Sequence, residues 1–195
     1  MPKRIVIIDG HPDARAERYV HALTKAYFDG AQSGGHEVRS VIVSDVDFPL
    51  LRTSDDFEHQ EAPAAIRSAQ DSIQWADHVV ILFPLWLGSM PALLKGFLEQ
   101  ALRPRFAFEP AAGRGLPRKL LSGKSARVIV TMGMPAAVYR WYFRAHGIKN
   151  LERNILGFSG FRPVKTCLIG AIETLGPAGR GRWLERLRRL GTSAD

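Results

Sequence analysis

Five short runs of β-branched and apolar residues recur along the chain, and segments with helical spacing separate them. Three of the runs are almost purely apolar at their centres, as strands buried on both faces of a sheet must be. The pattern therefore predicts a parallel sheet covered by helices on both faces. The runs are residues 3–9, 37–43, 77–84, 125–132 and 163–170.

The intervening segments carry apolar residues at intervals of three and four, which is typical of helices that pack one face on a sheet. Pro91 is expected as a first helical residue, Pro104 ends the same pattern, and a Tyr/Trp-rich helical stretch is expected near residues 137–146. Five such βα repeats predict a doubly wound α/β sheet with strand order 2-1-3-4-5. The helical stripes are Tyr19, Leu23, Ala26 and Tyr27; Ile66, Ala69, Ile73 and Ala76; and Leu94, Phe97, Leu98 and Ala101.

A length of 195 residues predicts a single domain over residues 1–195. Residues 103–123 are rich in Pro, Gly and Arg, so we expect a loop excursion over the surface, with room for a short hairpin. Near the end, at about 179–190, arginines surround apolar residues at helical spacing, which predicts an amphipathic C-terminal helix with a basic outer face.

The charge of +8 and the pI of about 10.1 favour anionic partners, such as nucleic acid, a membrane surface or phosphorylated small molecules. No recognition motif supports nucleic-acid binding, so we expect no nucleic-acid partner. The only cysteine, Cys167, excludes an intramolecular disulfide and lies in an apolar stretch that predicts a buried thiol. No metal site is expected. The start of the chain is too short for a signal peptide, which predicts a cytoplasmic protein.

The first candidate loop runs from Gly10 to Arg18, between the first strand and a helix. Ligands of open α/β sheets bind at the carboxyl ends of the strands. Backbone N–H groups at the helix start can hold a phosphate, near His11, and Arg15 or Arg18 can add charge-assisted bonds. Neither a P-loop nor a GxGxxG fingerprint is present. The alternative is that His11 only caps the loop.

The second candidate loop, residues 83–91, is apolar and has two prolines, a glycine and a tryptophan. A planar ring system can lie against it, with backbone N–H groups near Leu87 and Gly88 bonding the polar edge of the ring. The alternative is that Trp86 and Met90 are core residues.

The third candidate loop, residues 131–135, is followed by Tyr139, Tyr142 and His146. If this segment is helical, Tyr142 and His146 share a face, where a phenol and an imidazole can donate hydrogen bonds to a reduced flavin edge or to an acceptor oxyanion. The alternative is a satisfied surface pair.

The segment FPLWLGSMPALLKGFLEQAL at 83–102 closely resembles the strand, loop and helix of the flavodoxin-fold NAD(P)H:quinone oxidoreductases, a family that includes DT-diaphorase, modulator of drug activity B and ancillary subunits of potassium efflux systems. GHP at 10–12, FAF at 106–108, LLSGKSARVIVTMG at 120–133 and YRWYFRAHG at 139–147 follow in the family's order. The resemblance covers most of residues 4–170 and implies a flavodoxin-like fold.

This resemblance implies a flavin with its phosphate at His11 to Arg18 and its ring over the loop after the third strand. It implies hydride transfer from NAD(P)H through flavin N5 to a quinone-like acceptor in ping-pong order, in a homodimer with the pocket at the interface. We expect FMN rather than FAD, because the adenosine half of FAD needs extra surface. Phe106 and Phe108 resemble the wall of the substrate pocket, Tyr142 and His146 are the catalytic candidates, and the cofactor contacts are His11, Arg15, Arg18, Pro84, Leu85, Trp86, Leu87, Gly88, Thr131, Met132, Gly133 and Tyr139.

A regulatory or ancillary protein that keeps the fold but acts through a partner, such as a membrane transporter, is the chief alternative to the enzyme. Its support is the basic tail and the phosphate loop, which has Arg15-Ala16-Glu17-Arg18 where the family usually has a small hydroxyl residue and often Asn. This alternative predicts slow turnover with every quinone.

Overall fold

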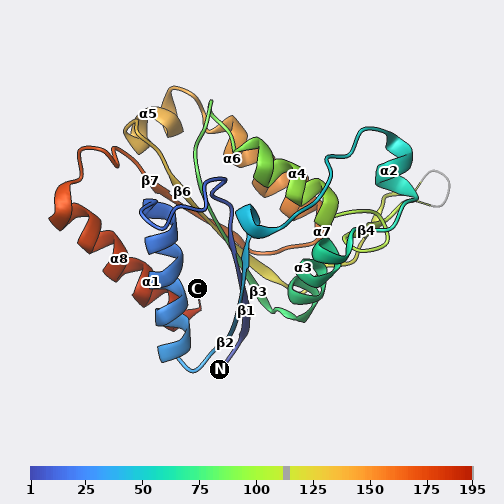
Figure 1. Ribbon diagram of the computed structural model, residues 1–195, viewed down its shortest axis with the longest axis horizontal. Helices are drawn as coiled ribbons and strands as arrows, with labels where there is room; N and C mark the ends of the chain where they lie inside the picture. Colours follow the sequence, from blue (N-terminus) through green and yellow to red (C-terminus); the bar gives the residue numbers. More distant parts are fainter. Residues whose placement is uncertain (112–114, 195) are drawn as a thin grey trace.

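Five parallel strands form one sheet in the computed structural model, which describes residues 1–111 and 115–194 (Figure 1). The sheet order is β2-β1-β3-β6-β7, which confirms the predicted order 2-1-3-4-5. All five apolar runs become strands, within a residue or so of their predicted ends. They are β1 (Arg4–Asp9), β2 (Glu37–Ile42), β3 (His78–Pro84), β6 (Ser125–Thr131) and β7 (Val164–Ile169).

Two helices, α1 (Tyr19–Ser33) and α8 (Gly176–Ser193), cover one face of the sheet (Figure 1). They pack so closely that a Cβ on Gly30 would lie 2.1 Å from the carbonyl oxygen of Arg188, so only glycine fits there. Helix α8 confirms the predicted amphipathic C-terminal helix and extends it at both ends. Its residue Leu187 is buried against the sheet, while its arginines are exposed.

The other face of the sheet is covered by helices α3 (Ala64–Trp75) and α4 (Ala92–Ala101) and by the segment from α6 (His146–Asn150) through the π-helical turn η2 (Leu151–Leu156) to α7 (Gly157–Ser159). The predicted apolar stripes form the buried sides of α1, α3 and α4, except that Tyr19 of α1 is only partly buried. Pro91 precedes α4 as its N-cap rather than as its first helical residue, because its ψ of 147° is extended.

The predicted helical stretch near 137–146 is wrong in its extent. Helix α5 (Ala136–Trp141) ends early, and the chain turns sharply at Arg144 and Ala145, whose φ angles are 54° and 50°. A new helix, α6, starts at His146. Periodicity alone gave no sign of this break, because neither residue of the turn is a glycine or a proline.

The predicted excursion contains the expected hairpin, formed by β4 (Phe108–Glu109) and β5 (Arg118–Lys119), while its residues 112–114 lie outside the described residues. The short helix α2 (Ser54–Glu58) and the 3₁₀ turn η1 (Val43–Asp45) were not predicted from the sequence pattern. Cys167 is buried and free, as predicted. Within residues 1–111 and 115–194, no helix has both the length and the apolar character that crossing a bilayer requires.

Candidate functional site

A buried carboxylate organises the loop that follows β1. Asp9, the last residue of the strand, is 2% exposed. Its Oδ1 accepts the backbone N–H of His11 at 3.0 Å, and its Oδ2 contacts His21 Nδ1 at 2.6 Å and the Thr24 hydroxyl at 2.9 Å. This network fixes the loop to the start of α1. This network was not predicted from the sequence, although His21 and Thr24 are three apart on one helix face and follow an acidic strand end.

His11 is a neutral imidazole in this arrangement. Burial and the neighbouring His21 lower the pKa of His11. Its Nδ1 accepts the backbone N–H of Asp13 at 3.0 Å, so the proton of the neutral ring is on Nε2. The ring lies edge-on to Trp86, with centroids 6.4 Å apart. His11 therefore does cap the loop, and it also connects that loop to the turn after β3.

The surroundings of His21 favour its protonated, imidazolium form. Its two ring nitrogens face two acceptors, the Asp9 carboxylate at 2.6 Å and the Asp13 carbonyl at 2.8 Å, and both contacts need a proton on the ring. Burial opposes the charge, but the hydrogen bonds to Asp9 and Asp13 outweigh it and raise the pKa of His21. The pKa of His11 in the loop and the pKa of His21 in α1 are therefore shifted in opposite directions.

An NMR titration of the imidazole signals should separate the two rings, with the midpoint of His21 above and that of His11 below the ordinary value of about 6.5. Because the folded pKa of His21 is raised, its charged form contributes stability that is complete below about pH 6.5 and is lost as pH rises through the folded pKa. Because the folded pKa of His11 is lowered, its neutral form contributes stability that is present above about pH 6.5 and is lost as pH falls through the folded pKa. A midpoint for His21 at or below that of His11 would contradict this assignment.

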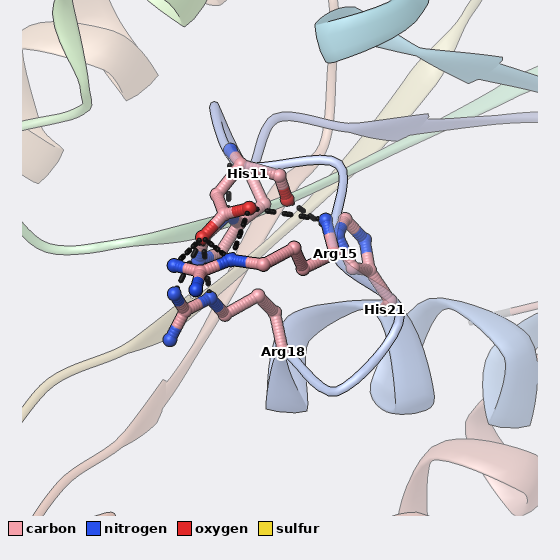
Figure 2. Close-up of polar contacts among 5 residues, drawn as sticks. His11, Arg15, Arg18 and His21 are labelled. Atoms are coloured by element: carbon pink, nitrogen blue, oxygen red, sulfur yellow. Dashed lines mark hydrogen bonds and ion pairs between the residues drawn. The ribbon is translucent and has the colours of Figure 1, made fainter.

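Two arginines converge on one carboxylate at the start of α1 (Figure 2). Arg15 Nη2 lies 2.7 Å from Asp13 Oδ2, and Arg18 Nε lies 2.6 Å from the same atom. The N–H of Arg15 and the guanidinium beside it lower the pKa of Asp13. Helix α1 has no side-chain N-cap, although the N–H of His21 in its first turn already donates to the Arg18 carbonyl at 3.0 Å. Asp13 therefore lies between the two guanidinium groups and pairs with both.

The loop after β3 makes a tight turn that presents apolar side chains. The N–H and C=O groups of Trp86 and Ser89 bond each other at 2.9 and 3.0 Å, and the two residues between them, Leu87 and Gly88, have φ angles of 47° and 80°. Positive φ at both central positions is the type I′ geometry. Trp86 is 51% exposed and Leu87 fully exposed, while Met90 is buried in the core.

Tyr139 and helix α6 both contact the turn formed by residues 86–89. The hydroxyl of Tyr139, which is buried, donates to the carbonyl of Gly88 at 2.9 Å. A Cβ on Gly147 would lie 2.2 Å from that carbonyl oxygen, so α6 approaches the turn as closely as a glycine allows. Tyr139, a predicted cofactor contact, therefore lies beneath the turn and positions it.

The ends of β3 and β6 are joined beside this turn. Pro84 pairs with Thr131, and Leu85 donates its N–H to the Thr131 carbonyl at 2.7 Å. The Thr131 hydroxyl is buried and has no hydrogen-bond partner among the described residues. Met132 is buried, and Gly133 is exposed at the edge of the loop. The three predicted contacts of the third loop thus lie at the same edge as the other two loops.

Tyr142 and His146 lie on either side of the break between α5 and α6. They do not share one continuous helix, so the predicted common face is not formed. Both are exposed, and Tyr142 packs edge-on against Phe143 at 5.0 Å. His146 directly precedes Gly147, the residue that touches the Gly88 turn, so its backbone lies beside that turn.

Phe106 and Phe108 lie apart from the three loops. They belong to the excursion that follows α4, a ten-residue helix about 15 Å long that leads away from the turn. Phe108 packs against Phe158 at 4.8 Å and lines an apolar pocket of about 280 Å³. Within one chain, these two residues are not brought together with Trp86.

A sequence model of the flavodoxin-like fold family matches residues 3–189. The chain belongs to this family. It is 33% identical over 152 residues to human ribosyldihydronicotinamide dehydrogenase [quinone], an alignment that covers 72% of this chain but only 63% of that protein. It is 27% identical over 190 residues to an FMN-dependent NADH:quinone oxidoreductase of Nitratidesulfovibrio vulgaris, with 87% of each chain covered.

Among solved structures, Smu.1420 from Streptococcus mutans UA159 superposes on this flavodoxin-like chain with a TM-score of 0.80. The two are 25% identical, and the match covers 97% of this chain and 98% of the other. The likeness therefore includes the excursion and the C-terminal helix as well as the sheet.

The edge of this flavodoxin-like sheet fits a flavin. A buried hydroxyl without a partner costs about 1–3 kcal/mol, and a ligand beside Thr131 would remove that cost. Trp86 and Leu87 offer apolar surface for a planar ring, and Arg15 and Arg18 offer cations for its phosphate. Within the described residues, no cluster of three His, Cys, Asp or Glu side chains is arranged to hold a metal ion.

Proposed function

We propose that this protein is a flavin-dependent NAD(P)H:quinone oxidoreductase that uses FMN and transfers hydride from the nicotinamide to a quinone-like acceptor in ping-pong order. The observation that carries the proposal is the meeting of three features at one edge of the sheet. They are the paired guanidinium groups at α1, the exposed apolar type I′ turn after β3, and the unpartnered Thr131 hydroxyl after β6.

The named relatives support the same chemistry. One is called an FMN-dependent NADH:quinone oxidoreductase and another a quinone-reducing dehydrogenase. When bound, a flavin supplies the hydride relay between two substrates that bind in turn. The contribution of this chain is to position the ring and to orient charge around it.

Each loop has a separate role in the proposal. Arg15 and Arg18 bind the phosphate after leaving Asp13, while Nε2–H of His11 is a donor at the junction between the phosphate loop and Trp86. Trp86 and Leu87 cover one face of the ring. Tyr142 and His146, which are exposed on either side of the break between α5 and α6, donate hydrogen bonds to the acceptor.

The proposal includes a homodimer. Apolar side chains are exposed around the candidate site, while the predicted wall residues Phe106 and Phe108 lie at the far end of α4 in the same chain. Pairing two chains would bury this apolar surface and complete each pocket with side chains that its own chain does not supply. The exposed residues are Trp86, Leu87, Val138, Tyr142 and Phe143.

The deciding experiment is a visible spectrum of the purified protein, with the released chromophore identified and the bands followed without oxygen after addition of NADH or NADPH. We expect FMN bands that bleach with a nicotinamide nucleotide and recover when a quinone is added. A protein that takes up neither FMN nor FAD would refute the proposal. It would instead favour an ancillary protein that acts by binding a partner such as a membrane transporter.

A further inference from the structure

A groove of about 640 Å³ lies between α5, α6 and the edge strand β7. Half-buried Glu152 and Thr166 form part of its lining, and the Thr166 hydroxyl donates to the Glu152 carboxylate. Three exposed basic residues, Arg140, Arg144 and Lys149, also line it. No residue that lines this groove has a role in the proposed flavin site.

The basic residues of the groove differ from several other arginines of the protein. Arg15, Arg18 and Arg118 each pair with a carboxylate at 2.7 Å or less. In the part of the chain that the structure describes, none of the three cations of the groove forms an ion pair. Glu152 is the groove's only acidic residue and is engaged by Thr166, so the groove has a net positive charge.

The groove also contains an exposed aromatic plane. Trp141 is 77% exposed, and the Arg140 guanidinium carbon lies 5.9 Å from the centre of its ring. An indole of this kind can stack on a nucleobase, and the adjacent guanidinium can reach a phosphate attached to it. The backbone at Arg144 and Ala145 is left-handed, a conformation that costs energy for residues other than glycine and is concentrated at ligand sites.

We propose that this groove binds the adenosine end of the nicotinamide nucleotide and recognises the 2′-phosphate that distinguishes NADPH from NADH. A phosphate monoester carries a charge of about −1.5 to −2 at pH 7, which the unpaired cations can neutralise. Trp141 stacks on the adenine, and Arg140 and Arg144 bind the 2′-phosphate. This inference rests on the proposed reductase function and names the substrate that the site prefers.

The position of the groove agrees with this role. Ala145, the N-cap of α6, and Ile148 of α6 line the groove, and Gly147 of the same helix touches the turn at Gly88. One short helix therefore separates the groove from the proposed ring site. A dinucleotide that crosses the exposed end of α6 can place its two halves in the two sites.

The experiment compares the wild type with the double variant Arg140→Gln/Arg144→Asn, in which Asn suits the left-handed position. The matched control, Arg182→Gln/Arg186→Gln, removes the same charge from the exposed face of α8. Calorimetry with adenosine 2′,5′-bisphosphate should show binding to the wild type and the control, and a loss of affinity of about tenfold or more in the groove variant. The KM for NADPH should rise by a similar factor, while the KM for NADH changes little.

Binding of the bisphosphate equally to the groove variant and the wild type, or no binding to the wild type, would overturn the inference. An equal rise of both KM values would overturn the assignment of the 2′-phosphate. Failure of the proposed function is a separate result, because it would be seen as a wild-type protein whose flavin neither nucleotide reduces.

Discussion

Replacing both Arg15 and Arg18 with alanine is expected to weaken FMN binding about 100-fold and to leave riboflavin binding unchanged. Each guanidinium would lose a charge-assisted hydrogen bond to the phosphate, worth about 1.5 kcal/mol at a site open to solvent. The sum of about 3 kcal/mol corresponds to a factor of about 100 in Kd. Quenching of flavin fluorescence measures both ligands in the same apoprotein, and equal losses for FMN and riboflavin would show that the phosphate is elsewhere.

The substitution Asp13→Asn should change FMN binding at the same site in the opposite direction. The asparagine side-chain oxygen can still accept the Arg15 N–H, which Asp13 Oδ1 accepts at 3.0 Å, so the local turn is kept. The negative charge that competes with a phosphate for the two arginines is removed. We expect tighter FMN binding and no change for riboflavin, whereas weaker FMN binding would mean that Asp13 supports the phosphate rather than replacing it.

Gly147→Ala is expected to destabilise the protein by about 2 kcal/mol and to release the flavin, although alanine is the better helix former. The new Cβ would lie 2.2 Å from the Gly88 carbonyl oxygen, so the turn that carries Trp86 and Leu87 must move and the Tyr139 bond to it must stretch. Overpacking of this kind costs about 1–3 kcal/mol.

Gly181→Ala is the matched control for that variant. Gly181 lies inside α8, and a Cβ there would meet nothing within 4 Å. The same substitution should therefore stabilise the protein by about 0.5–1 kcal/mol. Urea denaturation of both variants gives the comparison, and an equal gain in stability from both would mean that α6 does not press on the turn.

The apolar runs predicted the central strands because a strand buried on both faces needs a short, continuous run of apolar residues. The three ligand-side loops followed from the sheet order, since the carboxyl ends of parallel strands lie at one edge. Their residues His11, Trp86 and Thr131 were named for this reason, and the structure places all three at that edge.

Features that depend on contacts between distant segments were not predictable in the same way. From the sequence, Asp9 is expected only as the polar end of a strand. The packing of α1 is what buries its carboxylate against His21. The break at Arg144 depends on the packing of α6 under the Gly88 turn, so no local residue indicated it. The placement of Phe106 away from Trp86 likewise follows from the direction of α4, which apolar spacing does not give.

The pairing of α1 with α8 has a consequence for how the molecule forms. The hydroxyl of Thr192 donates to the carbonyl of Gly30, a contact between residues 162 positions apart in the chain. Contacts of such long range slow folding, because a large loop must close before they form. During synthesis, α1 can cover only part of the sheet face under these two helices, and the remaining apolar side chains stay exposed until α8 leaves the ribosome, so that remaining part is where we expect chaperones to bind the nascent chain.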